Sequence, residues 1–184
     1  MEDIGTLLAL VAFAVIVAAM IWFVAAYNNL LAAAHRASQA WGNVDALLRQ
    51  RHDELPRFLD ACRPYVPHGQ TLFDRALEAC STIFGARQTQ DIATLSEAEA
   101  ELTQALAEIV TRATSHPDAA RDETLTALKR RIATLEAGIG ERRAIFNEAA
   151  ARNNLAVGRF PGNIVALLGG FRALPPFTVN ASRS

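Results

Sequence analysis

The residues of this chain best suited to chemistry lie between Asp45 and Arg57, where acidic and basic side chains alternate. Asp45, Arg49, Asp53 and Arg57 follow one another at intervals of four residues. On a helix this spacing brings opposite charges together on one face, where they form ion pairs. Such a ladder is usually a solvated surface rather than a reactive site.

Arg51 differs from this ladder because it falls between Leu48 and Leu55, on the apolar side of the same predicted helix. A guanidinium group in that position needs a buried partner or a bound ligand. Two roles for Arg51 therefore stay open: a structural ion pair within the protein, or an anion contact between helices.

A second polar group lies near the end of the last predicted helix, where Phe146-Asn147 is followed by Asn153-Asn154. Asparagine side chains often cap helices or hydrogen-bond to backbone groups close to them in sequence. We favour this local role over substrate binding.

Other signs of catalysis are missing from the sequence. The histidines are far apart and form no HExxH or ExxH motif, so they predict no metal site. The cysteines fall on apolar helical faces, which favours small buried side chains over a redox pair or a nucleophile. No phosphate-binding loop or nucleophile elbow occurs. We expect a non-enzymatic protein with no catalytic residue, metal or cofactor. The residues considered are His35, His52, His68, His116, Cys62 and Cys80.

Four stretches with helical periodicity follow the N-terminal segment, and none shows the alternation of a strand. The first runs from residue 27 to 62 with Pro56 inside it, which predicts a kink rather than an end. The second covers residues 72–84 and is predicted to stop at Gly85. The third covers residues 91–114. The fourth, residues 125–149, repeats apolar residues in heptads typical of a coiled-coil-like seam. Short turns between these stretches predict an all-α protein, an antiparallel four-helix bundle.

The first 26 residues predict a single transmembrane helix that continues into the bundle. No charged residue occurs from Ile4 to Ala26. At about 1.5 Å per residue this segment is about 34 Å long, slightly more than the hydrocarbon core of about 30 Å. Its acidic start and its length argue against a cleaved signal peptide. Trp22, Phe23 and Tyr27 fall where an interfacial aromatic belt is expected.

The flanking charges predict the orientation of this helix. Two acids precede it, whereas Arg36, Arg49 and Arg51 follow it. Because basic residues near a span stay on the cytoplasmic side, we expect the N-terminus outside and the bundle in the cytoplasm.

Charge and composition also separate the later parts of the chain. The whole chain has 18 basic and 19 acidic residues, so we expect no nucleic-acid partner. Acids gather on the third predicted helix and bases on the fourth, which either pair with one another or form two separate solvated faces. After a bundle region at residues 27–158, residues 159–184 form an apolar, Gly-rich, basic tail. This tail covers either the membrane surface or an apolar groove of the bundle.

Several motifs taken in order resemble the LemA family. They are Tyr27-Asn28, the pattern AWxxVDxxLxxRxDxLP from Ala40 to Pro56, His116-Pro117-Asp118 in place of an aromatic-Pro turn, and FPxNxxAxxxGF from Phe160 to Phe171. The candidate interaction or structural residues within this resemblance are Trp41, Asp45, Arg51, Asp53, Pro56, Arg143, Asn147, Phe160, Pro161, Asn163 and Phe171. The late Tyr-Asn pairs of the family appear here as Phe146-Asn147 and Asn153-Asn154.

The resemblance implies a bacterial inner-membrane protein with a cytoplasmic helical bundle and no agreed enzymatic activity. We expect an interaction or scaffolding module, with membrane lipid and an unidentified protein as partners and with self-association left open. The alternative is a membrane-anchored, ligand-sensing bundle with Arg51 as its anion contact.

Overall fold

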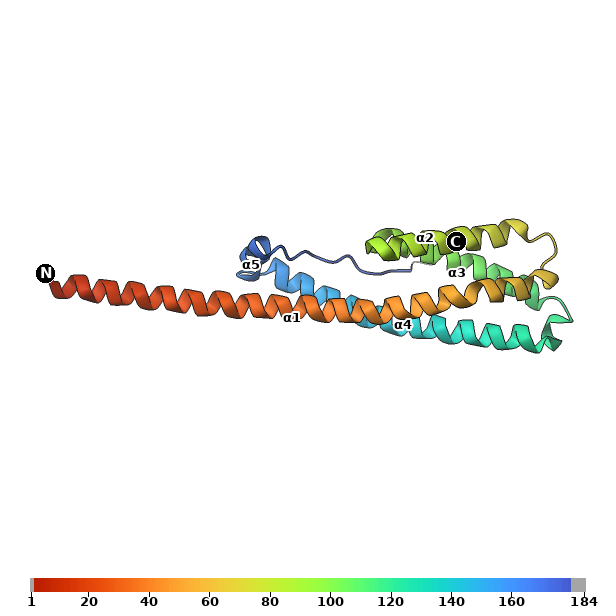
Figure 1. Cartoon of the computed structure of the whole chain (residues 1–184), viewed down its shortest axis with the longest axis horizontal. Helices are drawn as coiled ribbons and strands as arrows, with labels where there is room; N and C mark the ends of the chain where they lie inside the picture. The colour runs from red at the N-terminus through yellow and green to blue at the C-terminus, as the bar shows by residue number, and fades with distance from the viewer. Residues whose placement is uncertain (1, 180–184) are drawn as a thin grey trace. The chain divides into compact units, whose positions relative to one another are not determined.

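Every regular element in the computed structural model is a helix, across the residues 2–179 that it describes. The side chains are described from Ile4 onward. This confirms the all-α prediction (Figure 1). The elements are α1 (Glu2–Cys62), η1 (Arg63–Tyr65), α2 (Gln70–Thr89), α3 (Ile92–Thr114), η2 (Ala119–Arg121), α4 (Glu123–Gly158) and α5 (Gly162–Gly169).

The contacts divide the chain into two compact units, each built from two separate stretches of sequence. The bundle unit contains residues 40–147 and the chain from Pro175 onward. The flanking unit contains the chain up to Gln39 together with residues 148–174. The helices α1 and α4 each contribute to both units. Arg183 of the predicted basic tail lies outside the described residues.

The bundle unit is an antiparallel four-helix bundle with an apolar core. The helices α2 and α3 lie side by side, and the later part of α1 and the first part of α4 complete the bundle (Figure 1). Most of the heptad seam predicted for α4 is buried, and five of its members are at most 7% exposed: Leu125, Ile132, Leu135, Ile139 and Phe146. The other two members, Leu128 and Ala149, are half-buried.

The helix ends in this unit follow from short side chains that satisfy free backbone groups. Asp91 caps α3, since its Oδ1 accepts a hydrogen bond of 3.1 Å from the backbone N–H of Thr94. Asp122 does the same for α4, accepting a hydrogen bond of 2.9 Å from the N–H of Leu125. The helix α1 continues through Pro56 to Cys62, as predicted.

The prediction that the second helix ends at Gly85 is wrong. The helix α2 continues to Thr89 and ends at Gln90, which has a left-handed backbone with φ of 55°. Gly85 has no such conformation and sits inside the helix. An interior glycine costs up to about 1 kcal/mol relative to alanine. Burial of Ile83 and Ala86 on either side offsets this cost.

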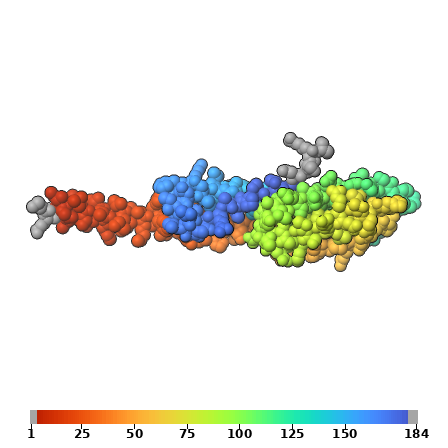
Figure 2. Space-filling model, turned by 90° about the horizontal axis from the view of Figure 1, so that it is seen from above, coloured from red at the N-terminus to blue at the C-terminus, as the bar shows by residue number. Residues whose placement is uncertain are grey.

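The flanking unit begins with a stretch of α1 that has no neighbour over most of its length. Residues 4–25 are exposed, and this part of α1 is seen as a bare red rod (Figure 2). By length and composition, one described helix, α1, is apolar enough to cross a membrane. Further along, Leu30 and Ala37 become buried.

The flanking unit also contains an element that the sequence analysis missed. The apolar tail forms the helix α5, which follows a cis peptide bond between Phe160 and Pro161. Gly170 ends α5 in the left-handed conformation, with φ of 71°. At Gly162 a Cβ would lie 2.1 Å from the carbonyl oxygen of Ala156, so only glycine permits this close approach to α4.

Candidate functional site

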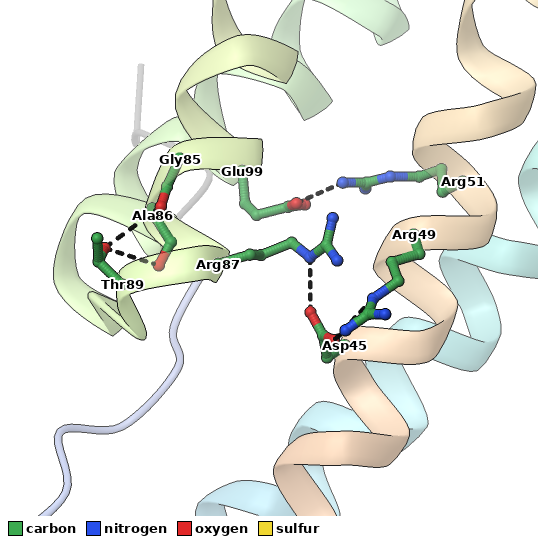
Figure 3. Close-up of polar contacts among 8 residues, drawn as sticks. All are labelled: Asp45, Arg49, Arg51, Gly85, Ala86, Arg87, Thr89 and Glu99. Atoms are coloured by element: carbon green, nitrogen blue, oxygen red, sulfur yellow. Dashed lines mark hydrogen bonds and ion pairs between the residues drawn. The ribbon is translucent and has the colours of Figure 1, made fainter.

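Arg51 lies at the centre of a buried charge cluster that joins three helices of the bundle unit. From α1 its guanidinium donates to the carboxylate of Glu99 on α3 (Figure 3). Its Nη1 donates to Oε1 of Glu136 on α4 at 2.7 Å. The Arg51 and Glu99 side chains are each 2% exposed, whereas the Glu136 side chain is 35% exposed. Arg51 therefore has protein partners of its own.

Burial and charge act in opposite directions on this cluster. Burial disfavours the charged form of Arg51, but the carboxylates of Glu99 and Glu136 outweigh it and raise the pKa of Arg51. Burial raises the pKa of the Glu99 carboxyl, and the nearby Arg51 offsets only part of this rise. Burial thus favours the neutral form of Glu99, and the ion pair with Arg51 favours its charged form.

Asp45 anchors a second charge group nearer the surface, between α1 and α2. Arg87 of α2 donates from Nε to its Oδ1 at 2.6 Å, and Arg49 donates from Nε to its Oδ2 at 3.0 Å (Figure 3). Burial raises the pKa of Asp45, but the hydrogen bonds from these two arginines outweigh it and hold the pKa below its ordinary value.

The predicted ladder around Asp45 is formed only in its first step. Among the ion pairs of the described chain, Asp45–Arg49 is present, but neither Arg49–Asp53 nor Asp53–Arg57 occurs. Asp53 and Pro56 are exposed. Asp53 lines an open surface pocket, and Asp45 lies in the same pocket. His52, stacked on Phe84 at a centroid distance of 5.6 Å, also lines it.

The acidic face of α3 and the basic face of α4 do not pair directly. No ion pair within residues 4–179 joins an acid of α3 to a base of α4. Arg131 of α4 instead pairs with Glu54 of α1 at 2.8 Å. The structure therefore favours the second of the two possibilities left open by the sequence, with α1 providing the interhelical partners of α3 and α4.

A group of aromatic side chains in the bundle unit surrounds Phe177. The ring of Phe177 is fully buried, and it meets Trp41 edge-on at a centroid distance of 6.3 Å. Trp41 also packs edge-on against Phe146 at 5.4 Å. The guanidinium of Arg143 lies over the ring of Phe177 at 5.9 Å. Phe177 was not recognised from the sequence, because nothing near it repeats with helical periodicity.

The asparagines of α4 bind the returning C-terminal segment, residues 170–179, and the prediction of a local role for them is wrong. In the bundle unit, Asn147 donates from Nδ2 to the carbonyl of Phe177 at 2.9 Å and accepts from its N–H at 2.8 Å. In the flanking unit, Asn154 makes the same pair of contacts with Leu174, both at 2.8 Å. Asn153 is buried and donates to the carbonyl of Arg172 at 2.9 Å. These amides provide hydrogen-bond partners for the backbone of a segment that itself belongs to neither a helix nor a strand.

The remaining candidate residues gather in the flanking unit. Phe160 is exposed but touches Trp22, with ring centroids 5.7 Å apart. Phe171 packs edge-on against Tyr27 at 5.6 Å. Asn163 is exposed, and its Oδ1 accepts from the N–H of Ile164.

Pro161 is the residue directly before α5. The candidate residues therefore divide into two groups, one in each unit, rather than forming one site.

The two cysteines behave as the sequence predicts. Cys62 and Cys80 are free and buried. Burial raises the pKa of each thiol to about 11, which suppresses the reactive thiolate at neutral pH. In the described part of the chain, no group of three or more His, Cys, Asp or Glu is arranged to hold a metal ion.

Glu99 is the main residue of the buried charge cluster that the sequence analysis did not recognise. A signal for it exists, because Glu99 falls between Leu95 and Leu102 on the apolar stripe of α3. Arg51 occupies the equivalent position between Leu48 and Leu55 on α1. Two opposite charges on two apolar stripes indicate a buried pair.

The profile of the LemA family matches residues 40–184, which is most of the chain. The chain therefore belongs to the LemA family. A comparison with curated proteins found no match.

Proposed function

We propose that this LemA-family protein is a non-enzymatic, single-pass membrane protein whose helical bundle acts as a cytoplasmic interaction or scaffolding module. The observation that carries this proposal is the continuity of α1. One helix begins with an exposed, uncharged segment and continues without interruption into the core of the bundle unit. A bare apolar rod of this length is stable in a bilayer and unfavourable in water.

The interior of the bundle supports a binding role over a catalytic one. Its buried arginine is already paired with two carboxylates of the same chain, and its thiols have raised pKa values. The outer surface, by contrast, offers groups for a partner. Leu77 and Phe84 of α2 are 42% and 47% exposed and belong to the same helix. Both line one open surface pocket between α1 and α2, together with His52, Leu55 and Pro56, and this pocket offers an apolar contact to a partner.

The ligand-sensing alternative has less support. The Arg51 side chain is only 2% exposed, so an anion that bound it would have to enter the core and displace Glu99. Removing one partner of a buried pair strands the other charge, which costs several kcal/mol.

The orientation can be tested with a reporter that is active only in the cytoplasm. Fused after Ser184 of the full chain, the reporter is expected to be active, because the basic residues follow the apolar segment. Activity only when the reporter precedes Met1 would reverse the orientation.

The interaction role can be tested by photo-crosslinking in intact bacterial membranes. A photoreactive residue replaces Leu77 in one variant and the exposed Thr134 of α4 in a matched control. We expect one reproducible adduct from position 77 that is weak or absent from position 134. The adduct should disappear when Phe84→Glu is added. Equal and diffuse adducts from both positions would argue against a specific docking face.

A further inference from the structure

The short helix α5 in the flanking unit has one apolar side that no part of the unit covers. Phe160, Ile164, Leu167 and Leu168 are 72%, 50%, 84% and 72% exposed. Ile164, Leu167 and Leu168 are spaced three and one residues apart, which places them on one side of α5. Phe160 lies two residues before the helix and contacts Trp22. We call these four residues the α5 face. The other side of α5 is buried through Gly162, Val165 and Ala166, so the helix is held in place while its most apolar side chains point outward.

The contacts of α5 fix its level along α1. Phe160 touches Trp22, and Phe171, just beyond the helix, touches Tyr27. Gly162 approaches Leu30 so closely that a Cβ would lie 3.1 Å from its Cδ1. The helix α5 therefore lies beside residues 22–30 of α1. This stretch contains the end of the uncharged segment and the first buried residue of the flanking unit.

We propose that the α5 face contacts lipid, so that α5 lies in the interfacial layer of the same bilayer that α1 crosses. The inference rests on the proposed membrane anchoring of α1. Trp and Tyr side chains favour the boundary between hydrocarbon and headgroups. The residues on either side of α5 contact one of each, since Phe160 packs on Trp22 and Phe171 on Tyr27. A short apolar helix beside that boundary buries its exposed side in lipid without crossing the membrane.

Charge selects an anionic lipid leaflet over a second copy of the chain as the occupant. Arg159 and Arg172 lie on either side of α5, both exposed, and no acidic residue follows Glu148 in the sequence. Two copies meeting through the α5 face would bring like charges together. An anionic leaflet offers opposite charge to the same arginines.

The proposal can be tested by measuring the depth of spin labels on the full chain in vesicles of phosphatidylcholine and phosphatidylglycerol. Single cysteines for labelling replace Leu167 or Leu168 in a background with Cys62→Ala and Cys80→Ala. Leu77→Cys, on an exposed apolar position of α2, is the matched control outside the flanking unit. Ile16→Cys, within the apolar segment of α1, reports on the anchoring itself.

Collision with oxygen, which enters lipid, is compared with collision with a water-soluble nickel chelate. The ratio of oxygen to nickel accessibility at positions 167 and 168 is expected to be several-fold higher than at 77 and lower than at 16. Adding Arg159→Gln and Arg172→Gln should lower the ratio at 168 in the mixed vesicles and leave it unchanged in pure phosphatidylcholine.

Three results would overturn the inference in distinguishable ways. A ratio at 168 equal to that at 77, with 16 still in lipid, removes the lipid contact of α5 and leaves the anchor intact. Spin–spin broadening at 168 that disappears on dilution with unlabelled chain identifies a second copy as the occupant. A water-accessible label at 16 refutes the anchoring and the inference with it.

If the cysteine-free background loses its helical circular dichroism, the native cysteines are kept. Leu168→Trp is then compared with Leu77→Trp. Quenching by brominated lipid replaces the collision ratio as the measure of depth. The tryptophan at 168 is expected to be the more strongly quenched of the two, and equal quenching counts against the lipid contact.

Discussion

The bundle unit buries a pair of charged side chains, whereas the flanking unit exposes several large apolar ones. In the bundle unit a charged pair, Arg51 and Glu99, lies inside an apolar core. In the flanking unit large apolar side chains such as Leu167 and Leu168 lie outside. The first arrangement is stable only if both charges stay paired within the protein. The second is stable only if something apolar covers the surface. The buried charges of the bundle unit thus find their partners within that unit, whereas the exposed side of α5 favours an apolar surrounding.

The largest effect expected from breaking this contrast comes from Arg51→Met in the bundle unit. It leaves Glu99 buried without its cation, and we expect the free energy of unfolding to fall by about 3 kcal/mol at neutral pH. Denaturant unfolding followed by circular dichroism measures this loss. Arg49→Met on the same helix is the control, because its side chain is 67% exposed and should contribute within about 0.5 kcal/mol.

The Arg51→Met effect has a pH dependence that identifies its cause. Burial raises the folded-state pKa of Glu99, so the variant loses stability as pH rises through that pKa and regains it toward acid. Adding Glu99→Leu should restore most of the stability. A loss that does not change with pH and is not rescued would mean that Arg51 acts through packing alone.

Gly162→Ala is expected to be the most damaging single change in the flanking unit. A Cβ at this position would lie 2.1 Å from the backbone oxygen of Ala156, so α5 must move away. Overpacking of this kind costs about 1–3 kcal/mol. Hydrogen exchange should become faster at the amides of α5 and stay unchanged in α2 and α3. Gly158→Ala, where the added methyl meets nothing within 4 Å, is the matched control.

The asparagine contacts can be broken separately in the two units. Asn147→Ala removes two hydrogen bonds to Phe177, and Asn154→Ala removes two to Leu174. Each loss is expected to cost about 1–2 kcal/mol locally. Hydrogen exchange at the N–H of Phe177 should rise only in the first variant, and at the N–H of Leu174 only in the second. Simultaneous release of both amides in either variant would show that the C-terminal segment detaches as a whole.

Asp45 gives the bundle unit a stability that acid removes. Its folded-state pKa lies below its ordinary value, so the contribution is present above the unfolded pKa of about 4 and is lost as pH falls through the folded one. We expect a loss of about 1 kcal/mol on acidification, which Asp45→Asn should abolish. Thermal unfolding measured at neutral and acidic pH tests this. An unchanged acid sensitivity in Asp45→Asn would assign it to other carboxyls.

The smallest expected effect is a gain in stability at Gly85. Because Gly85 lies inside α2 and nothing occupies the space within 4 Å of an added Cβ, alanine should fit without strain. Gly85→Ala is expected to stabilise the bundle unit by about 0.5–1 kcal/mol. A decrease in the unfolding temperature would contradict the position of Gly85 within the helix.

The two units also differ in how far their structure follows from the sequence. The core of the bundle unit is readable because Leu125, Ile132 and Ile139 repeat in heptads, and heptads specify a buried seam. The need of Arg51 for a partner is readable for the same reason. The end of α2 could not be predicted. Local preference favours a stop at Gly85, whereas burial of Ile83 and Ala86 extends the helix to Thr89.

The contacts that shape the flanking unit do not repeat at regular intervals in the sequence, so periodicity does not predict them. Asn154 binds the carbonyl of Leu174, 20 residues away, and no sequence pattern indicates a contact between residues so far apart. The helix α5 is only eight residues long, too short for a periodic pattern to show. Its glycines suggest a loop, although Gly162 is required by close contact and Gly170 by its backbone conformation.

In the C-terminal segment, Asn147 and Asn154 form hydrogen bonds with main-chain groups of Phe177 and Leu174, so the course of the segment does not depend on its side chains. Between and beyond the anchored residues, Ala173, Pro175 and Pro176 are exposed, and neither amide touches a side chain there. Substitutions at these outward positions can alter the properties of the surface while the segment keeps its course. The segment is therefore a site where new binding specificities could be introduced, by evolution or by design, with little effect on folding.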